Sequence, residues 1–355
     1  MVLIKNMLYL GWLGKGNVGD DVLFELFKYM FYKYHENKSN KEVINIDSIP
    51  VVEGYKIDLA SYDLIVLGGG SLIHLPYWLN ICAEGMKKGI PVVTWGTGFD
   101  GLYKEENDHA IHLTGQYTSS YRNIYENFDY LSVRGPFTTN LLTNIGIKKE
   151  IHEIGDPALV YDSEISGDHL EVARQDKHIL INWGTSYNNV FGGNELMVEQ
   201  ELAITIKSLI SQGYIITIYP IWTEDISAVK RLGQKINDAR CHVQEIVYEA
   251  KTLQKIIQNS YLSINLKLHA NILSAAANRP FISLAYRGKC FDFSRTVNCL
   301  DYTIATDIVT SRKILNLVQN IETNYDNIVG RFKEAKAKYH PKIVDSIQTM
   351  SEILG

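Results

Sequence analysis

Residues 7–21, MLYLGWLGKGNVGDD, join an apolar run to a loop with three glycines and two adjacent aspartates. The run MLYLGWL predicts a buried strand, and the next segment, Asp21 to Tyr34, has the periodicity of a helix. Glycine permits positive φ angles and close backbone approach, so the loop suits a turn between strand and helix. Unpaired amides at the start of that helix favour an anion or several hydroxyl groups.

This loop is not a P-loop, because the lysine and hydroxyl residue that end that motif are missing, and its spacing fails the G-x-G-x-x-G dinucleotide pattern. Asp20 or Asp21 would also repel a phosphate placed beside it. A purely structural reading has Asp20 capping the helix. A second glycine-rich turn, GGGSLIH (68–74), follows the strand-like run DLIVL and is expected at the same sheet edge. Two such turns form one wall of a ligand cleft.

Short apolar runs alternate with helical segments through the first half of the chain, pause at the polar stretch 161–177 and resume at HILINWGTS (178–186). Such alternation predicts an α/β fold of two Rossmann-like doubly wound domains that face a cleft. We assign residues 1–165 to an N-terminal, acceptor-side domain and residues 175–322 to a C-terminal, donor-side domain. The helical pattern over residues 323–355 predicts closing helices.

Composition excludes several classes of protein. The 35 lysines and arginines do not outnumber the 40 aspartates and glutamates, which argues against nucleic-acid binding. The four cysteines lack a C-x-x-C pair, so neither a zinc knuckle nor a disulfide framework is expected. No apolar stretch approaches the roughly 18 residues of a membrane span. We therefore expect a cytoplasmic protein, with at most peripheral contact at the inner face of the membrane.

Basic side chains follow several of the expected strands. Arg134 comes directly after YLSV, where a guanidinium can grip a carboxylate or phosphate, although a salt bridge at a strand end is the alternative. Lys267 and His269 begin an alanine-rich helix, a position that disfavours cations unless an anion is bound. For His269 alone, a core histidine is a serious alternative. Arg287 and Lys289 follow the next strand, so Lys267, His269 and Lys289 are expected around one small dianion.

Six short motifs, in this order along the chain, match those of a known protein family. The chain resembles the polysaccharide pyruvyl transferase family, which moves enolpyruvate from phosphoenolpyruvate onto sugar hydroxyls as a ketal. The matching motifs, which span nearly the whole chain, are the G-x-G-N-x-G-D loop (14–20), DLIVLGGG (63–70), VRGP (133–136), GDPAL (155–159), LHA (268–270) and the Y-x-x-K of 286–289. The chain departs from the family pattern at Lys267, where arginine is usual, and at Asp21, where glutamate is common. A lysine does not reproduce a bidentate arginine grip.

The resemblance implies a glycosyltransferase B-like pair of domains, with phosphoenolpyruvate as donor substrate and no cofactor or metal. It implies roles for three groups of residues: catalytic Arg134, Lys289 and His269; donor-binding Lys267, Tyr286 and Arg287; and acceptor-binding Gly16, Asn17, Gly19, Asp20, Gly69 and Gly70. We expect His269 to be kept protonated by neighbouring anions and to donate or relay the proton, with phosphate binding as its other role. Asp20 is a candidate general base.

Two other functions fit the same sequence. One is a nucleotide-sugar glycosyltransferase of the same architecture, and the other is a catalytically silent sugar-binding protein of an envelope-assembly complex. Four aromatic residues fall in turns where a sugar could stack, although such rings more often fill a core: Tyr77, Trp78, Trp95 and Trp183. The acceptor sugar, the hydroxyls that are bridged, the attachment of the acceptor to a lipid and the oligomeric state stay open.

Overall fold

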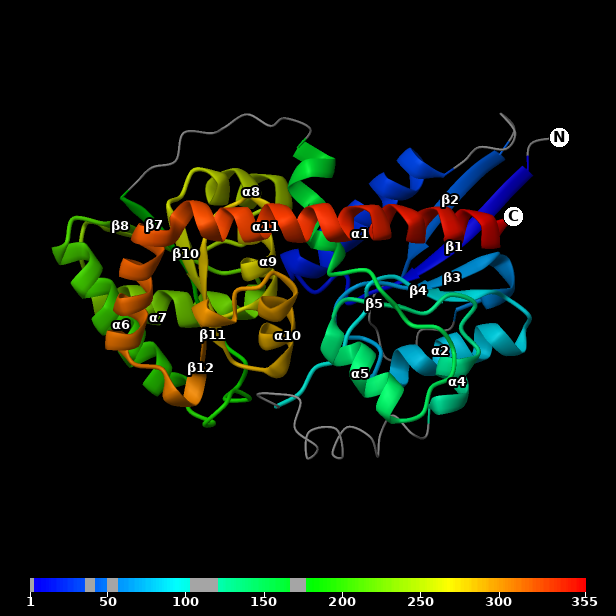
Figure 1. Cartoon of the computed structure of the whole chain (residues 1–355), viewed down its shortest axis with the longest axis horizontal. Coiled ribbons are helices and arrows are strands. Elements are labelled where there is room, and N and C mark those ends of the chain that lie inside the picture. The colour runs from blue at the N-terminus through cyan, green and yellow to red at the C-terminus, as the bar shows by residue number, and fades with distance from the viewer. Residues whose placement is uncertain (1–2, 36–41, 50–56, 103–120, 167–176) are drawn as a thin grey trace.

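The structure, a computed structural model, describes residues 3–35, 42–49, 57–102, 121–166 and 177–355. Most of the expected linker at 161–177 lies outside the described residues. Two parallel sheets form two halves of the molecule, which lie side by side in Figure 1. The predicted α/β class with Rossmann-like domains is confirmed.

The first half contains a four-stranded parallel sheet in the order β2-β1-β3-β4. Two short strands, β5 and β6, pair beside it and continue it through single bridges such as Val93 to Tyr130. The strands are β1 (Leu3–Leu10), β2 (Glu42–Ser48), β3 (Leu64–Leu67), β4 (Val92–Thr94), β5 (Ser132–Val133) and β6 (His152–Glu153). The helices are α1 (Val18–Tyr34), α2 (Pro76–Lys87), α4 (Arg122–Glu126) and α5 (Pro136–Asn144).

The second half contains a six-stranded parallel sheet in the order β12-β11-β10-β7-β8-β9. The strands are β7 (His178–Asn182), β8 (Ile215–Tyr219), β9 (Cys241–Val243), β10 (Leu262–Asn265), β11 (Phe281–Ala285) and β12 (Thr303–Ala305). The helices are α6 (Glu195–Ser211), α7 (Ile226–Ile236), α8 (Ala250–Gln258), α9 (Leu268–Ala276) and α10 (Gly288–Thr296). Every residue of β10 and β11 is buried, as expected for central parallel strands covered by helices on both faces.

One buried apolar cluster runs through both halves. It contains Met7 and Tyr9 from β1, Ile179 and Ile181 from β7, and Ile347 from the C-terminal helix. A second cluster fills the other face of the first sheet. Because the larger cluster is continuous, the two halves share a core on the side of α1 and are not connected by a linker alone.

The C-terminal helix α11 (Ser311–Leu354) is one long helix that bends at Asn324, where φ is −117° and ψ is 16°. It begins inside the range that the sequence assigned to the second domain. Figure 1 shows it crossing from the second half to the first, and it contacts α6, α9 and α1. The helix therefore braces both domains against each other.

Glu164 ties α11 to α1. Its buried carboxylate accepts hydrogen bonds from Lys33 (2.9 Å) and Tyr34 (3.0 Å) at the end of α1, and contacts His340 Nε2 (2.5 Å) on α11. Burial alone would raise the pKa of this carboxyl, but His340, Lys33 and Tyr34 outweigh burial and hold the pKa below its ordinary value. The carboxylate is therefore the favoured form in the folded protein.

Replacing this carboxylate tests the brace. Glu164→Ala is expected to lower the free energy of unfolding by about 1–3 kcal/mol, because three partners lose their acceptor. The difference should shrink as the pH falls through the depressed pKa of Glu164, where the wild type also loses its charge. Urea denaturation measures both effects. The exposed Glu84→Ala on α2 is the control, and an equal loss in both variants would contradict the assignment.

Candidate functional site

A cavity of about 340 Å³ lies between the two domains, at the carboxyl ends of their strands. The loops after β1, β3, β4 and β5 line it from the first domain, and the loops after β7, β8, β10 and β11 line it from the second. This is the edge at which open parallel sheets bind ligands. The lining includes nine of the residues singled out from the sequence: Asn17, Asp20, Gly70, Arg134, Lys267, His269, Tyr286, Arg287 and Lys289.

The glycine loop after β1 is a contact between the domains. Asn17, not Asp20, caps α1, and its side chain accepts a hydrogen bond from Gly19 N at 3.1 Å. The loop pairs with the segment after β8, because Val18 N donates to Ile221 O at 3.0 Å. The purely structural alternative, in which Asp20 caps the helix, is therefore wrong, and Asp20 lies inside the first turn of α1.

Gly19 packs tightly against the second domain. A Cβ atom at this position would lie 2.0 Å from Nδ1 of His269, which comes from the first turn of α9 in the second domain. No side chain fits between them, so glycine is required for the observed apposition. Gly19 thus lets His269 pack directly against the first turn of α1.

Two other glycines of the predicted acceptor side also serve close packing. At Gly16, φ is +63° and a Cβ would lie 2.6 Å from Cγ2 of Thr223. A Cβ at Gly69 would lie 2.8 Å from Cδ2 of Leu23. Neither residue lines the cavity, whereas Gly70, with a φ of +94°, does.

Arg134 follows β5 and is 3% exposed. Its Nη2 donates to Phe99 O at 2.8 Å and to Ser71 Oγ at 3.2 Å. Nε and Nη1 are buried and have no hydrogen-bond partner among the described residues. Buried, unsatisfied guanidinium donors are costly, so this residue is suited to receive an anion in the cavity.

Asp100 links the cations of the second domain to the first domain. Its carboxylate lies 2.7 Å from Arg287 Nη1 and 3.1 Å from Lys289 Nζ, and Gly288 N donates to Gly101 O next to it. Burial alone would raise the pKa of Asp100, but Lys289 and Arg287 outweigh burial and hold the pKa below its ordinary value. The residue is therefore an internal anion between two cations of the cavity.

Lys267 lines the cavity but already has protein partners. Its Nζ lies 2.5 Å from Thr185 O and 3.1 Å from the buried Asp225 carboxylate. The same Nζ lies 5.2 Å from the ring centre of Trp222 and 5.8 Å from that of Tyr286. Lys267 is consequently neutralised in part.

Burial, modified by nearby charges, sets the protonation of Asp20 and His269. Burial raises the pKa of Asp20 to about 7, with Lys289 and Arg134 opposing this shift and Asp21 and Asp156 adding to it. Desolvation lowers the pKa of His269 to about 3, and the positive charges of Lys289 and Arg134 add to it. The expectation that anions keep His269 protonated is therefore wrong in the ligand-free structure, where its charged neighbours are cations. Asp20 instead titrates near neutrality.

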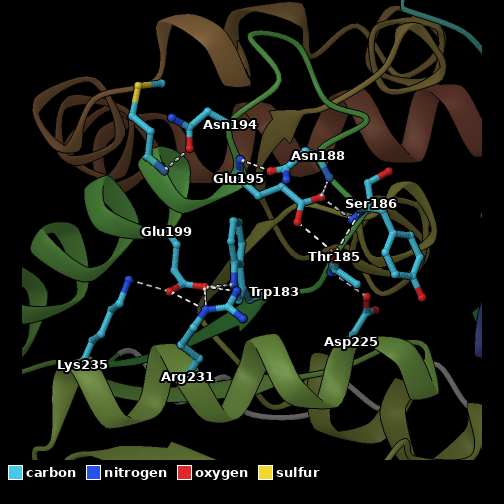
Figure 2. Close-up of polar contacts among 12 residues, drawn as sticks. Trp183, Thr185, Ser186, Asn188, Asn194, Glu195, Glu199, Asp225, Arg231 and Lys235 are labelled. Atoms are coloured by element: carbon cyan, nitrogen blue, oxygen red, sulfur yellow. Dashed lines mark hydrogen bonds and ion pairs between the residues drawn. The ribbon is translucent and has the colours of Figure 1, made fainter.

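The loop after β7 is held by two glutamates of α6, as Figure 2 shows. Glu195 accepts hydrogen bonds from Thr185 Oγ1 at 2.9 Å, from Asn188 N at 3.0 Å and from Ser186 N. Glu199 is buried, accepts from the Trp183 ring nitrogen and forms ion pairs with the side chains of Arg231 and Lys235. The loop is thus fixed where it lines the cavity.

The sequence analysis missed several lining residues. Asp100 follows β4, so the strand-end rule that selected Arg134 could also have found it. Trp12 lies at the end of the apolar run that the sequence assigned to a strand, whereas Tyr187 and Trp222 lie in turns that lack a strong motif. Three of the four aromatic residues that the sequence raised as stacking candidates, Trp78, Trp95 and Trp183, are fully buried in the core.

Within the described residues, no three His, Cys, Asp or Glu side chains gather in a group that could hold a metal ion. Among the same residues, no helix is both long and apolar enough to cross a membrane.

Two Rossmann-like domains with a ligand cavity between their strand ends define a protein of the glycosyltransferase B-like class. The chain belongs to the polysaccharide pyruvyl transferase family, which it matches over residues 16–288. This membership supports a transferase and confirms the family suggested by the sequence motifs. No protein of curated function matches the chain in sequence.

Solved structures share the fold at low sequence identity. The chain is similar to MnaA of S. aureus in a structure with UDP, at a TM-score of 0.61 and 10% identity over 93% of this chain and 91% of that chain. It is also similar to the UDP-GlcNAc 2-epimerase of Neisseria meningitidis bound to UDP-GlcNAc. The TM-score is 0.57 and the identity is 11%, over 93% of this chain and 94% of that chain. A third similar structure is the alpha,alpha-trehalose 6-phosphate synthase of Burkholderia multivorans. Its TM-score is 0.57 at 8% identity, over 99% of this chain and 97% of that chain. The likeness is one of architecture.

Removing the internal anion tests whether the cavity is built for anions. Asp100→Asn leaves Arg287 and Lys289 without their carboxylate, so the variant is expected to unfold about 1–3 kcal/mol more easily. Added inorganic phosphate should raise the melting temperature of this variant more than that of the wild type, because the two cations are then free to bind it.

The control is Asp301→Asn, which removes an exposed partner of Arg331 far from the cavity. An equal response to phosphate in all three proteins would contradict an anion site at Arg287 and Lys289.

Proposed function

We propose that the protein transfers enolpyruvate from phosphoenolpyruvate to two hydroxyls of a sugar, as a pyruvate ketal. The observation that carries this proposal is the arrangement of Arg134 from one domain with Lys289 and His269 from the other around one cavity. Phosphoenolpyruvate carries a phosphate and a carboxylate on three carbons, so its site needs several fixed cations. Two unsatisfied donors on the buried Arg134 support such a donor site.

The other cations take defined parts in this proposal. Lys289 and Arg287 share Asp100 in the ligand-free protein, and a bound dianion competes with that carboxylate for them. Lys267 stays with Asp225 and acts at longer range. This division fits the replacement of the family's usual arginine by lysine, because the bidentate grip is then left to Arg134.

We assign the proton transfer to Asp20 rather than to His269. The neutral carboxylic acid of Asp20, whose pKa is about 7, is available as a general acid at neutral pH. Neutral His269 is a hydrogen-bond partner for the departing phosphate, and its Nε2 has no partner among the described residues. A bound dianion would offset the positive charges that lower the pKa of His269, which allows a secondary part in proton relay.

The steps balance as follows. Asp20 protonates the methylene carbon of phosphoenolpyruvate, and the double-bond electron pair forms the new C–H bond, which leaves a cationic carbon stabilised by its ester oxygen. A sugar hydroxyl bonds to this carbon and returns its proton to the Asp20 carboxylate. The bond between carbon and phosphate oxygen breaks, and phosphate leaves with the electron pair. A second hydroxyl closes the ketal and gives its proton to phosphate.

The acceptor is a sugar of a cell-surface polysaccharide or of its lipid-linked precursor, modified in the cytoplasm or at the inner face of the membrane. Family membership supports a polysaccharide acceptor, while the donor, the ketal and the lipid are parts of the proposal. Asn17 and Asp20 border the cavity on the side of the first domain and are the proposed acceptor contacts.

One assay separates the proposed reaction from its rivals. The protein is incubated with phosphoenolpyruvate or with nucleotide sugars, together with galactosides and mannosamine derivatives. We expect inorganic phosphate from phosphoenolpyruvate only when a sugar is present. His269→Ala should lose about 100-fold of this activity, because the departing phosphate loses its hydrogen bond to the imidazole. Release of a nucleoside diphosphate would instead identify a glycosyltransferase. No release from either donor would favour a silent sugar-binding protein.

The acid assigned to Asp20 gives a specific pH dependence. The wild-type kcat/KM is expected to fall as the pH rises through about 7, because the proton donor is then ionised. Asp20→Asn should lose about 10²- to 10⁴-fold and lack this alkaline limb. The same variant should be more stable than the wild type at about pH 8, because the folded state disfavours ionised Asp20.

The control for this experiment is Asp21→Asn, the exposed neighbour of Asp20. It should stay active and move the alkaline limb slightly to lower pH, since it removes a negative charge that raises the pKa of Asp20. Full activity of Asp20→Asn with an unchanged pH profile would remove Asp20 from the chemistry.

A further inference from the structure

Tyr187 has an unusual backbone for an aromatic residue. It lies in the loop between β7 and α6 with a φ of +53°, and Asn188 follows with a φ of +57°. Left-handed conformations of non-glycine residues cost roughly 1 kcal/mol or more each and persist only when surrounding contacts hold them. Two such residues in succession indicate that contacts from outside these residues hold the loop in this conformation.

The contacts that hold this loop are specific. Tyr187 N donates to Thr185 Oγ1 at 3.0 Å, and Asn188 N donates to Glu195 Oε1 at 3.0 Å. Asn188 Oδ1 in turn accepts from Glu195 N at 3.0 Å, as Figure 2 shows. Because Glu195 is buried, this bracing is part of the domain interior.

The result is an exposed aromatic ring on the cavity wall. Tyr187 is 67% exposed although it lines the cavity. Its ring stands edge-on to that of Trp222, at 6.5 Å between centres and 87° between planes. Trp222 is fixed from the first domain, because its Nε1 donates to Lys15 O at 3.0 Å. Trp12 of the first domain lines the same cavity.

The hydroxyl of this ring is held by one acidic side chain. The Tyr187 hydroxyl donates to Glu224 Oε2 at 2.9 Å. That hydrogen bond raises the pKa of Tyr187, and the nearby carboxylates of Glu224, Asp225 and Glu195 add to the shift. Carboxylates accept hydrogen bonds from hydroxyl groups and repel phosphates. Glu224 therefore favours a hydroxyl-rich ligand next to the Tyr187 hydroxyl, while Lys267 Nζ lies 5.2 Å from the ring centre of Trp222.

We propose that Tyr187 and Trp222, together with Trp12 of the first domain, form the acceptor subsite, in which the C–H face of a pyranose ring stacks on the Tyr187 ring and Glu224 accepts a sugar hydroxyl. This assignment rests on the proposed function. It places the acceptor at the wall formed by the second domain, next to the cations that hold the donor. The sequence analysis put acceptor contacts on the first domain alone, so the subsite extends the acceptor site across the cleft.

Sugar binding tests the subsite separately from the reaction. Saturation-transfer NMR with methyl β-galactoside and with N-acetylmannosamine should detect binding to the wild type and a clear loss for Tyr187→Ala. If pyruvyl transfer occurs, Tyr187→Ala should raise the KM for the sugar about 2- to 10-fold while the KM for phosphoenolpyruvate stays unchanged. Tyr187→Phe, which keeps the ring, should show a smaller rise. Tyr32→Ala, at an exposed tyrosine of α1, is the matched control.

Several outcomes would overturn the subsite. These are binding of neither sugar to the wild type, equal binding to wild type and Tyr187→Ala, or binding of UMP that depends on Tyr187 while sugar binding does not. If sugar binding depends on Tyr187 but phosphoenolpyruvate releases no phosphate with any sugar, the subsite stands and the proposed pyruvyl transfer fails.

Discussion

The contact between His269 and Gly19 is the constraint on which the site depends. No Cβ atom fits at position 19, because it would lie 2.0 Å from the imidazole of the opposite domain. This contact fixes the separation of the two sheet edges, while the pairing of Val18 with Ile221 and the helix α11 hold the same arrangement from outside. Arg134 and Lys289, which follow strands of different domains, line one cavity as a consequence.

Burial gives this cavity its chemistry, and it acts in opposite directions on acids and bases. It raises the pKa of Asp20 to about 7 and lowers that of His269 to about 3, so near neutral pH His269 is neutral and Asp20 is only partly ionised. The guanidinium of Arg134 cannot give up its proton and keeps two unsatisfied donors. A dianion relieves these buried positive charges, and the Asp100 carboxylate takes that role at Arg287 and Lys289 in the ligand-free protein.

Local pattern predicted much of the fold. Apolar runs followed by glycine or by a basic residue located β1, β3, β5 and β10, and the strand-end rule then placed Asp20, Arg134 and His269 around one cavity. The features that could not be predicted from the sequence depend on contacts between residues far apart in the chain. The protonation of His269 depends on cations from two domains, and the cap at Asn17 depends on backbone geometry. The exposed Tyr187 depends on Glu195, which no local motif connects to a binding site.

The central claim is that cations of both domains converge on one small dianion. A crystal structure of the protein with phosphoenolpyruvate, or with inorganic phosphate, tests this most directly. Our account predicts the phosphate in contact with Arg134 of the first domain and Lys289 of the second, beside His269. A phosphate bound by residues of one domain alone, away from Arg134, would contradict it.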